Sequence, residues 1–159
     1  MQFTKSDTKN NIIILGKVKV GKIPLLQKII EDTKFDYVLI FDKYDEYAAD
    51  HKIDTMLFSP IPGIYSFSNP ELFSYLRDSF SDKETLFILD SAETLDQMEV
   101  HDLIIYPSNK VFVAVAYYVK PNNINEYKMK IIFDIHGNDF LYTKPGMIIQ
   151  RDSVYDLPF

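Results

Sequence analysis

The sequence predicts an α/β fold in which helices cover both faces of a mostly parallel β-sheet. Apolar runs of strand length alternate along the chain with amphipathic segments of helical length, which is the order of β-α-β units. The run at 35–41, FDYVLIF, lacks the polar alternation of a half-exposed strand, which indicates a parallel strand buried on both faces. With 159 residues, 47% of them hydrophobic and 25% charged, the chain is long enough for one domain with a substantial core.

The individual elements follow from hydrophobic period and from turn residues. Asn69 followed by Pro70 is the signature of a helix start, and the cluster SPIPG at 59–63 predicts a break in regular structure. In chain order we expect a strand at 11–15, a helix at 22–33, a strand at 35–41, a short helix beginning within 42–50, a short strand at 55–58, a helix after Asn69, a strand at 84–89, a helix at 91–103 and a strand at 111–119.

The C-terminal part has a different pattern. Residues 127–135, a turn at 136–139 and residues 140–143 predict an antiparallel β-hairpin, and a second turn leads to 147–150. We therefore expect a single domain over residues 1–159. Its core would cover 11–125, with the hairpin extension and a tail at 126–159.

Residues 11–31 carry the motif on which the functional interpretation depends. A strand is followed by G-x-x-x-x-G-K and then by a helix, which is the order of a P-loop. We therefore expect the single domain over residues 1–159 to be P-loop NTPase-like. The backbone N–H groups of such a loop cradle phosphates, and its lysine reaches the β- and γ-phosphates. We therefore predict an ATP site in which Lys22 faces solvent or phosphate. The predicted site consists of Gly16, Lys17, Lys19, Gly21, Lys22 and Ile23.

The motif departs from the P-loop pattern at the position after the lysine. A Ser or Thr hydroxyl normally holds Mg²⁺ there, whereas this chain has Ile23, which has no side-chain oxygen. Val18 and Val20 are also β-branched in a loop that favours small residues. The alternative is an ordinary βα unit with a glycine turn, which would bind no phosphate.

An apolar strand that ends in an acidic residue supplies the second candidate site. Residues 86–90 read LFILD, which has the form of a Walker B strand. Such a strand delivers its carboxylate to the edge of the sheet where ligands of open α/β sheets bind. We predict that Asp90 holds Mg²⁺, directly or through water. The alternative is a strand that ends in a helix N-cap.

Further motifs follow in a fixed order along the chain. The strand at 35–41 leads into D-x-x-x-E-Y, formed by Asp42, Glu46 and Tyr47, residues 86–95 read LFILDSAETL, and residues 113–124 read VAVAYYVKPNNI. With the P-loop, these motifs resemble the FtsK/HerA superfamily of DNA-translocating ATPases, and its viral packaging and Zot-like branch in particular. The resemblance implies ATP and Mg²⁺ as cofactors and a homo-oligomeric ring that acts on DNA.

The chain departs from the family where hydrolysis takes place. The resemblance implies a catalytic Glu at the position of Ser91, and a Ser/Thr-Gln pair where Tyr118 and Val119 stand. We therefore expect a degenerate member in which hydrolysis is weak or lost. Glu93 is the candidate general base, since it lies one turn later. The alternative for Glu93 is a solvated residue favoured by the helix dipole.

Composition narrows the function classes. The net charge is -6, so the chain is not a general nucleic-acid coat, and a DNA contact would need a local basic patch. The absence of Cys excludes disulfides and thiolate metal sites. No apolar run is long enough to span a bilayer, and we expect a cytoplasmic or virion-associated protein with no membrane partner.

Two further functions stay open at this point. A catalytically inactive P-loop domain could act as a structural or regulatory subunit of a viral or mobile-element assembly. A small-molecule kinase is the third possibility, disfavoured by Ile23 and by the lack of an Arg-rich lid. The apolar tail at 154–159 would either cover the hairpin of its own subunit or dock on a neighbouring one.

Overall fold

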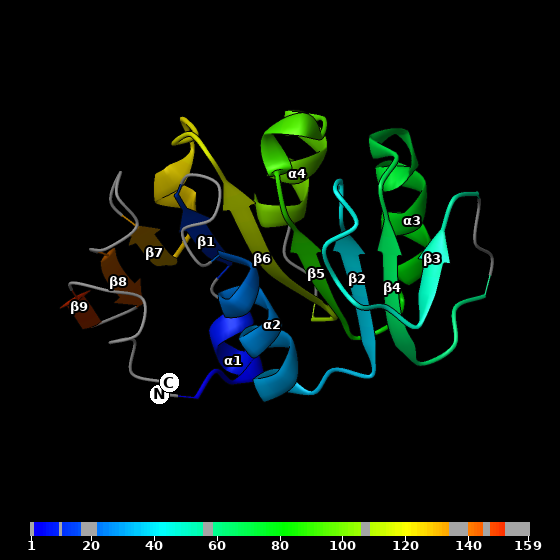
Figure 1. Cartoon of the computed structure of the whole chain (residues 1–159), viewed down its shortest axis with the longest axis horizontal. Coiled ribbons are helices and arrows are strands. Elements are labelled where there is room, and N and C mark those ends of the chain that lie inside the picture. The colour runs from blue at the N-terminus through cyan, green and yellow to red at the C-terminus, as the bar shows by residue number, and fades with distance from the viewer. Residues whose placement is uncertain are drawn as a thin grey trace.

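The computed structural model describes residues 2–9, 11–16, 22–55, 59–105, 109–133, 140–144 and 147–151, with side chains up to Ile131 (Figure 1). The predicted loop residues Lys17, Lys19 and Gly21, the hairpin turn at 136–139 and the tail at 154–159 lie outside these residues.

Within the described residues, nine strands form one sheet. In spatial order the strands are β3 (His51–Ile53), β4 (Gly63–Phe67), β2 (Tyr37–Phe41), β5 (Thr85–Leu89), β6 (Val111–Tyr117), β1 (Ile12–Leu15), β7 (Met129–Phe133), β8 (Phe140–Lys144) and β9 (Met147–Arg151). The first seven strands in this order are all parallel, which confirms the predicted fold class. Strands β8 and β9 continue the sheet in antiparallel fashion, as the hairpin pattern predicted.

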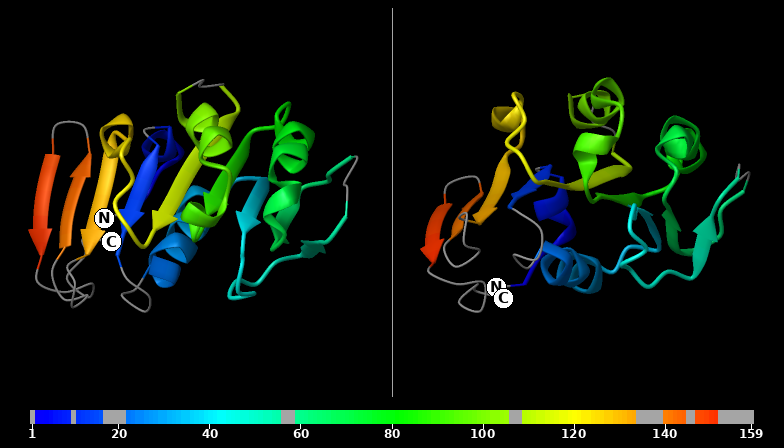
Figure 2. Two further views of the ribbon diagram at one scale, coloured as in Figure 1. Left: turned by 90° about the horizontal axis from the view of Figure 1, so that it is seen from above. Right: turned by 45° about the horizontal axis from the view of Figure 1, so that its top comes forward.

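Helices cover both faces of the sheet, as Figure 2 shows. One face carries α1 (Lys5–Thr8) and α2 (Lys22–Thr33), and the opposite face carries the remaining helices. Those are η1 (Pro70–Leu72), α3 (Phe73–Phe80), η2 (Ala92–Thr94), α4 (Gln97–Ile105) and η3 (Ile124–Glu126).

The strand residues divide between two cores. In β1, Ile12 and Ile14 pack with Leu26 of α2, while Ile13 and Leu15 face the cluster that includes Leu76 of α3. All four residues of β1 are buried, because successive side chains of a strand point to opposite faces and both faces are covered. The continuous apolar runs in the sequence have this cause.

The region between β2 and α3 differs from the prediction. Residues 42–50 form turns rather than a helix, and a short strand, β3, lies at His51–Ile53. Residues 56–58 of the strand expected at 55–58 lie outside the described residues. Strand β4 was not predicted, because Pro60, Pro62 and Gly63 at its start favoured an irregular loop. Its residues Ile64 to Phe67 nonetheless have the β-branched and aromatic composition of a strand.

Two other boundaries also differ. The predicted helix at 91–103 is two helices, η2 and α4, separated by Leu95 in an extended conformation. Strand β7 pairs in parallel with β1, so the parallel part of the sheet continues beyond residue 125 to Phe133. The predicted cap is confirmed, since Oδ1 of Asn69 accepts a hydrogen bond of 3.0 Å from the Glu71 N–H.

Candidate nucleotide-binding site

The predicted site residues that the structure describes gather at one edge of the sheet. The register pairs Leu15 of β1 with Tyr117 of β6, and Leu89 of β5 with Val115 of β6. The carboxyl ends of these parallel strands therefore meet at the same edge, where ligands of open α/β sheets bind. Gly16 follows β1, Tyr118 follows β6 and Asp90 follows β5, so that Tyr118 stands between the other two.

Lys22 is the first residue of α2 and turns back over the end of β1. Its side chain is 5% exposed, so the expectation that it faces solvent was wrong. Its Nζ donates to the Gly16 carbonyl at 2.5 Å and lies 3.5 Å from the Tyr117 carbonyl oxygen. The ammonium also lies 3.7 Å from the ring centroid of Tyr118. The end of β1 and the end of β6 thus enclose this cation.

Burial and nearby carboxylates act on Lys22 in opposite directions. Burial lowers the pKa of Lys22, because desolvation disfavours the charged amine. The negative charges of Asp90, Glu93 and Glu46 raise it in part. Lys22 and these carboxylates therefore form one electrostatic cluster.

Asp90 lies at the end of β5 and is 6% exposed. Its Oδ2 accepts a hydrogen bond of 2.9 Å from the Tyr47 hydroxyl, and its Oδ1 accepts one of 2.8 Å from the Ser91 N–H. Burial raises the pKa of Asp90, against the opposing effects of the Tyr47 hydrogen bond and of Lys22. The N-cap of η2 is Ser91, so Asp90 is not the helix cap that the alternative interpretation required.

A polar turn after β2 delivers Tyr47 to Asp90. The Asp42 carboxylate accepts hydrogen bonds from the Glu46 N–H at 2.8 Å and from the Tyr47 N–H at 3.0 Å. These bonds fold the chain back, and Asp45 completes the turn with a φ of 55°. The motif of Asp42, Glu46 and Tyr47 was noted in the sequence, but not the contact of Tyr47 with Asp90. An acidic residue five positions before a buried Tyr is the signal that could have indicated it.

Glu93 anchors the backbone that follows β6. Its Oε2 accepts a hydrogen bond of 3.1 Å from the Tyr118 N–H, and its Oε1 is buried without a hydrogen-bond partner among the described residues. Glu93 is therefore not the solvated residue of the alternative interpretation. The Ser91 hydroxyl donates to the Tyr118 hydroxyl at 3.1 Å, and Ser91 has a left-handed backbone with a φ of 55°.

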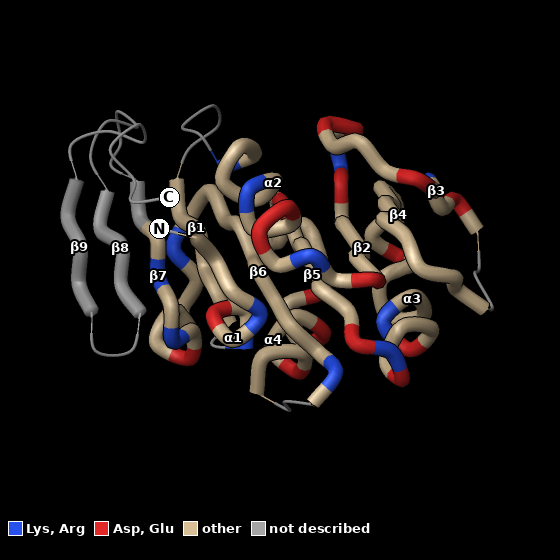
Figure 3. Tube along the Cα trace, turned by 90° about the horizontal axis from the view of Figure 1, so that it is seen from below, with Lys and Arg blue, Asp and Glu red and all other residues tan. Residues whose placement is uncertain are grey.

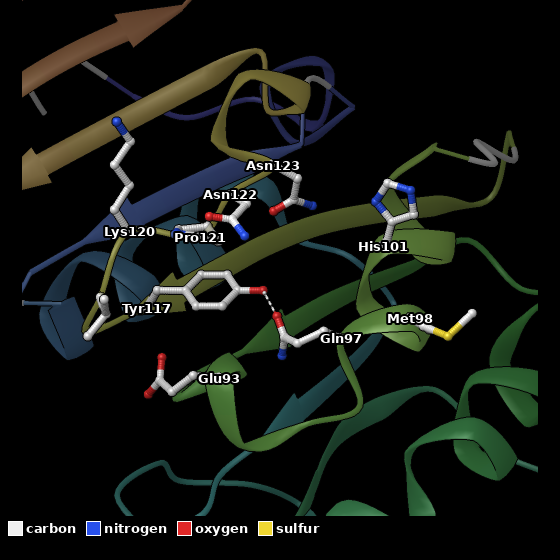
Figure 4. Close-up of a pocket in the computed structure, with 10 residues that line it drawn as sticks. Glu93, Gln97, Met98, His101, Tyr117, Lys120, Pro121, Asn122 and Asn123 are labelled. Carbon is white, nitrogen blue, oxygen red and sulfur yellow. Dashed lines mark hydrogen bonds between the residues drawn. The ribbon is translucent and has the colours of Figure 1, made fainter.

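A cleft with a volume of about 520 Å³ lies beside this edge, between α4 and the segment after β6 (Figure 4). The Tyr117 hydroxyl donates to Oε1 of Gln97 at 2.9 Å across it, and Glu93 lines it as well. Met98 and Val119 are exposed at 76% and 72%. The cleft is large enough for a small molecule, and sequence analysis did not indicate it.

The side chains that could hold Mg²⁺ are few. No group of three His, Asp or Glu side chains in the described part of the chain is arranged to bind a metal ion. Asp90 lies at the edge of the sheet where the metal would bind, and its charge interacts with that of Glu46. Ile23 supplies no oxygen. Mg²⁺ is commonly held by one or two carboxylates together with substrate phosphates and water. The residues therefore fit a Mg²⁺ that arrives with a nucleotide, and not a metal site of the protein alone.

Negative charge is concentrated near the site. Figure 3 shows acidic residues along the connection between β2 and β3, where Asp42, Asp45, Glu46 and Asp50 lie.

None of the helices that the structure describes is long and apolar enough to cross a membrane.

No protein-family model and no curated protein matches the chain. Among solved structures, the genome packaging NTPase B204 from Sulfolobus turreted icosahedral virus 2, in complex with ATP-gammaS, is similar at a TM-score of 0.63 and 10% identity, over 92% of this chain and 98% of that one. A structural study of PH0250 from Pyrococcus horikoshii OT3 gives a TM-score of 0.42 and 12% identity, over 93% of this chain and 88% of that one. An ATPase from the type III secretion system of pathogenic bacteria gives a TM-score of 0.38 and 14% identity, over 78% of this chain and 52% of that one. The first similarity identifies the architecture of this chain as an α/β, P-loop NTPase-like fold.

Proposed function

We propose that this protein is a nucleotide-binding P-loop protein of the FtsK/HerA packaging type in which hydrolysis is weak or lost. The observation that carries the proposal is the enclosed Lys22 ammonium at the carboxyl edge of the sheet, coupled to Asp90 at the end of β5. A cation and a carboxylate at this edge are the two charges that bind phosphates and their metal ion. In the proposal, Gly16, Lys17, Lys19, Gly21, Lys22 and Ile23 surround the phosphates of ATP.

Asp90 would hold Mg²⁺ together with phosphate oxygens and water. The metal would neutralise phosphate charge, while Tyr47 and Ser91 orient the carboxylate through the hydrogen bonds described above. Support for ATP comes from the B204 structure, which contains an ATP analogue and is similar along nearly its whole length.

The arrangement favours binding over turnover. Ile23 offers no hydroxyl for the metal, and Ser91 stands where the family has its catalytic Glu. The left-handed backbone of Ser91 is a conformation that a long side chain adopts at a cost. The Glu93 carboxylate is engaged with the Tyr118 backbone rather than open to a water, so as general base it would have to release that bond.

The same observations support a second function, in which the domain is an inactive structural or regulatory subunit. The contact of the Tyr118 ring with Lys22 favours it, because the ring occupies one side of the cation. In either case, the protein would form a homo-oligomeric ring in the cytoplasm or in association with a virion. Any contact with DNA would be made by this ring.

ATP binding by isothermal titration calorimetry, with and without Mg²⁺, tests the proposal. Lys22→Met should weaken ATP affinity by about tenfold or more, because the amine is lost as a charge-assisted donor to phosphate. The matched control is Lys28→Met on the same helix, where the lysine pairs with Asp32 at 3.1 Å. Equal affinity for ATP in the parent and in Lys22→Met would overturn the phosphate role.

A further inference from the structure

Tyr118 is held in place by three separate contacts. Its ring faces the Lys22 ammonium at 3.7 Å from the centroid. Its hydroxyl accepts from the Ser91 hydroxyl, and its N–H donates to Glu93, both at 3.1 Å. The residue thus joins the end of β6 to the start of α2 and to the segment that follows β5.

Three neighbouring groups cover the ammonium of Lys22. Two of its neighbours are the carbonyl oxygens of Gly16 and Tyr117, which belong to the backbone at the ends of two paired strands and cannot move without disturbing the sheet. The third neighbour is the Tyr118 ring, which can rotate about its side-chain bonds. A phosphate oxygen that approaches Lys22 therefore displaces the ring more easily than the carbonyl groups.

We propose that Tyr118 is a positioning residue that covers the Lys22 ammonium and has to swing aside before a phosphate group binds that amine. The inference rests on the proposed nucleotide site and adds to it a competition between an aromatic ring and a phosphate for one cation. A cation–π contact of this kind corresponds to about threefold to thirtyfold in a binding constant.

The remaining contacts of Tyr118 determine how the ring is held. Burial raises the pKa of the Tyr118 phenol, so the ring meets Lys22 as a neutral aromatic face. The Glu93 carboxylate fixes the backbone at Tyr118. A swing of the side chain therefore breaks the ring contact with Lys22 and the hydrogen bond with Ser91, and leaves the backbone bond to Glu93 intact. Glu93 also lines the cleft beside the site.

Chemical labelling tests the cover without any nucleotide. Acylation of lysines by N-acetoxysuccinimide, followed by peptide mass spectrometry, measures the accessibility of each amine. Lys22 should react slowly in the parent and about fivefold or more faster in Tyr118→Leu, because the aromatic face is lost. Tyr118→Phe keeps the ring and should react like the parent. An unchanged rate at Lys22 in Tyr118→Leu would overturn the inference.

A matched control comes from the opposite edge of the sheet. Tyr37 has the Lys83 ammonium at 5.9 Å from its ring centroid, so Tyr37→Leu also removes a tyrosine ring beside a lysine. Tyr37→Leu should leave the labelling of Lys22 unchanged. Equal acceleration in both variants would indicate general loosening of the fold and would refute a specific cover.

Calorimetry with ATP-gammaS distinguishes the inference from the proposed function. Tyr118→Leu should bind the analogue about threefold to thirtyfold more tightly than the parent, and the gain should vanish in the Lys22→Met background. A gain that persists without Lys22 would refute the competition. If no variant binds the analogue, the proposed function fails, and the labelling result alone then decides whether Tyr118 covers Lys22.

Discussion

The hydroxyl of Tyr47 donates a hydrogen bond of 2.9 Å to Asp90, across 43 positions of sequence. Both side chains are buried, at 4% and 6% exposure. Burial and, to a smaller extent, the charge of Asp90 raise the pKa of Tyr47 far above its usual range, so the hydroxyl stays a donor. The bond ties the turn after β2 to the carboxylate that we assign to Mg²⁺, and it gives that carboxylate a fixed orientation.

Replacement of this donor should cost stability. Tyr47→Phe leaves a buried carboxyl oxygen of Asp90 without its partner, and we expect the free energy of unfolding to fall by about 1 to 3 kcal/mol. Urea unfolding measures this. The control is Tyr44→Phe, whose ring is 57% exposed and which should change little. A loss below about 0.5 kcal/mol in Tyr47→Phe would contradict a stabilising role for the bond.

The pH dependence of stability should reveal the buried carboxyl of Asp90. Its pKa is raised in the folded state, so the folded protein binds the proton more tightly than the unfolded chain, whose value is near the ordinary 3.8. The contribution of Asp90 to stability is therefore full below that pH and decreases as the pH rises through the folded-state pKa.

The matching variant is Asp90→Asn, which has no charge to bury. Relative to the parent, it should gain melting temperature at pH 7 and lose that gain as the pH falls toward 4. Thermal unfolding across this range is the measurement. An advantage that grows on acidification would show that the sign is wrong and that Asp90 stabilises the fold as an anion.

A hydroxyl restored after Lys22 should increase the dependence of binding on Mg²⁺. Ile23→Thr supplies the oxygen that P-loops use for the metal. The ratio of ATP affinities with and without Mg²⁺ should rise in calorimetry, while Ile23→Val should leave it unchanged. Ile23 packs against the core on the α2 face, so Ile23→Val should lose about 0.5 to 1.5 kcal/mol of stability and Ile23→Thr at least as much. Equal ratios in the two variants would argue against a metal beside residue 23.

Turnover by the unmodified protein should be very slow. Loss of a positioned electrostatic group commonly costs on the order of a hundredfold in rate, and Ile23 and Ser91 represent two such losses. Phosphate release from ATP in the presence of Mg²⁺ measures the rate. Rapid hydrolysis that disappears in Glu93→Gln would contradict the expectation and would identify Glu93 as the base.

The sequence predicted the parts of the fold that depend on local pattern. The bounds of α2 and the buried strands β1, β2, β5 and β6 follow from hydrophobic period. Strand β4 was missed because two prolines precede it and a glycine begins it, and such residues outweigh a short aromatic run in any local pattern.

The arrangement of the candidate site could be predicted less completely than the fold. Asp90 and Lys22 were predicted from motifs, and the structure brings them to one edge. The burial of Lys22 and its contact with Tyr118 could not be predicted, because they depend on which strand lies between β1 and β5. That neighbour is β6, whose last residues are distant in sequence from both.

The position of β1 between β6 and β7 has a consequence for how the protein folds. Ile12 pairs with Ala114 on one side and with Met129 on the other, so both neighbours of the first strand are made late in synthesis. Such non-local pairing slows folding, because a long loop must close before any contact forms. During translation the apolar residues of β1 therefore have neither partner strand until residues 111–133 have left the ribosome. A nascent chain that stalls before that point is the form most prone to aggregate.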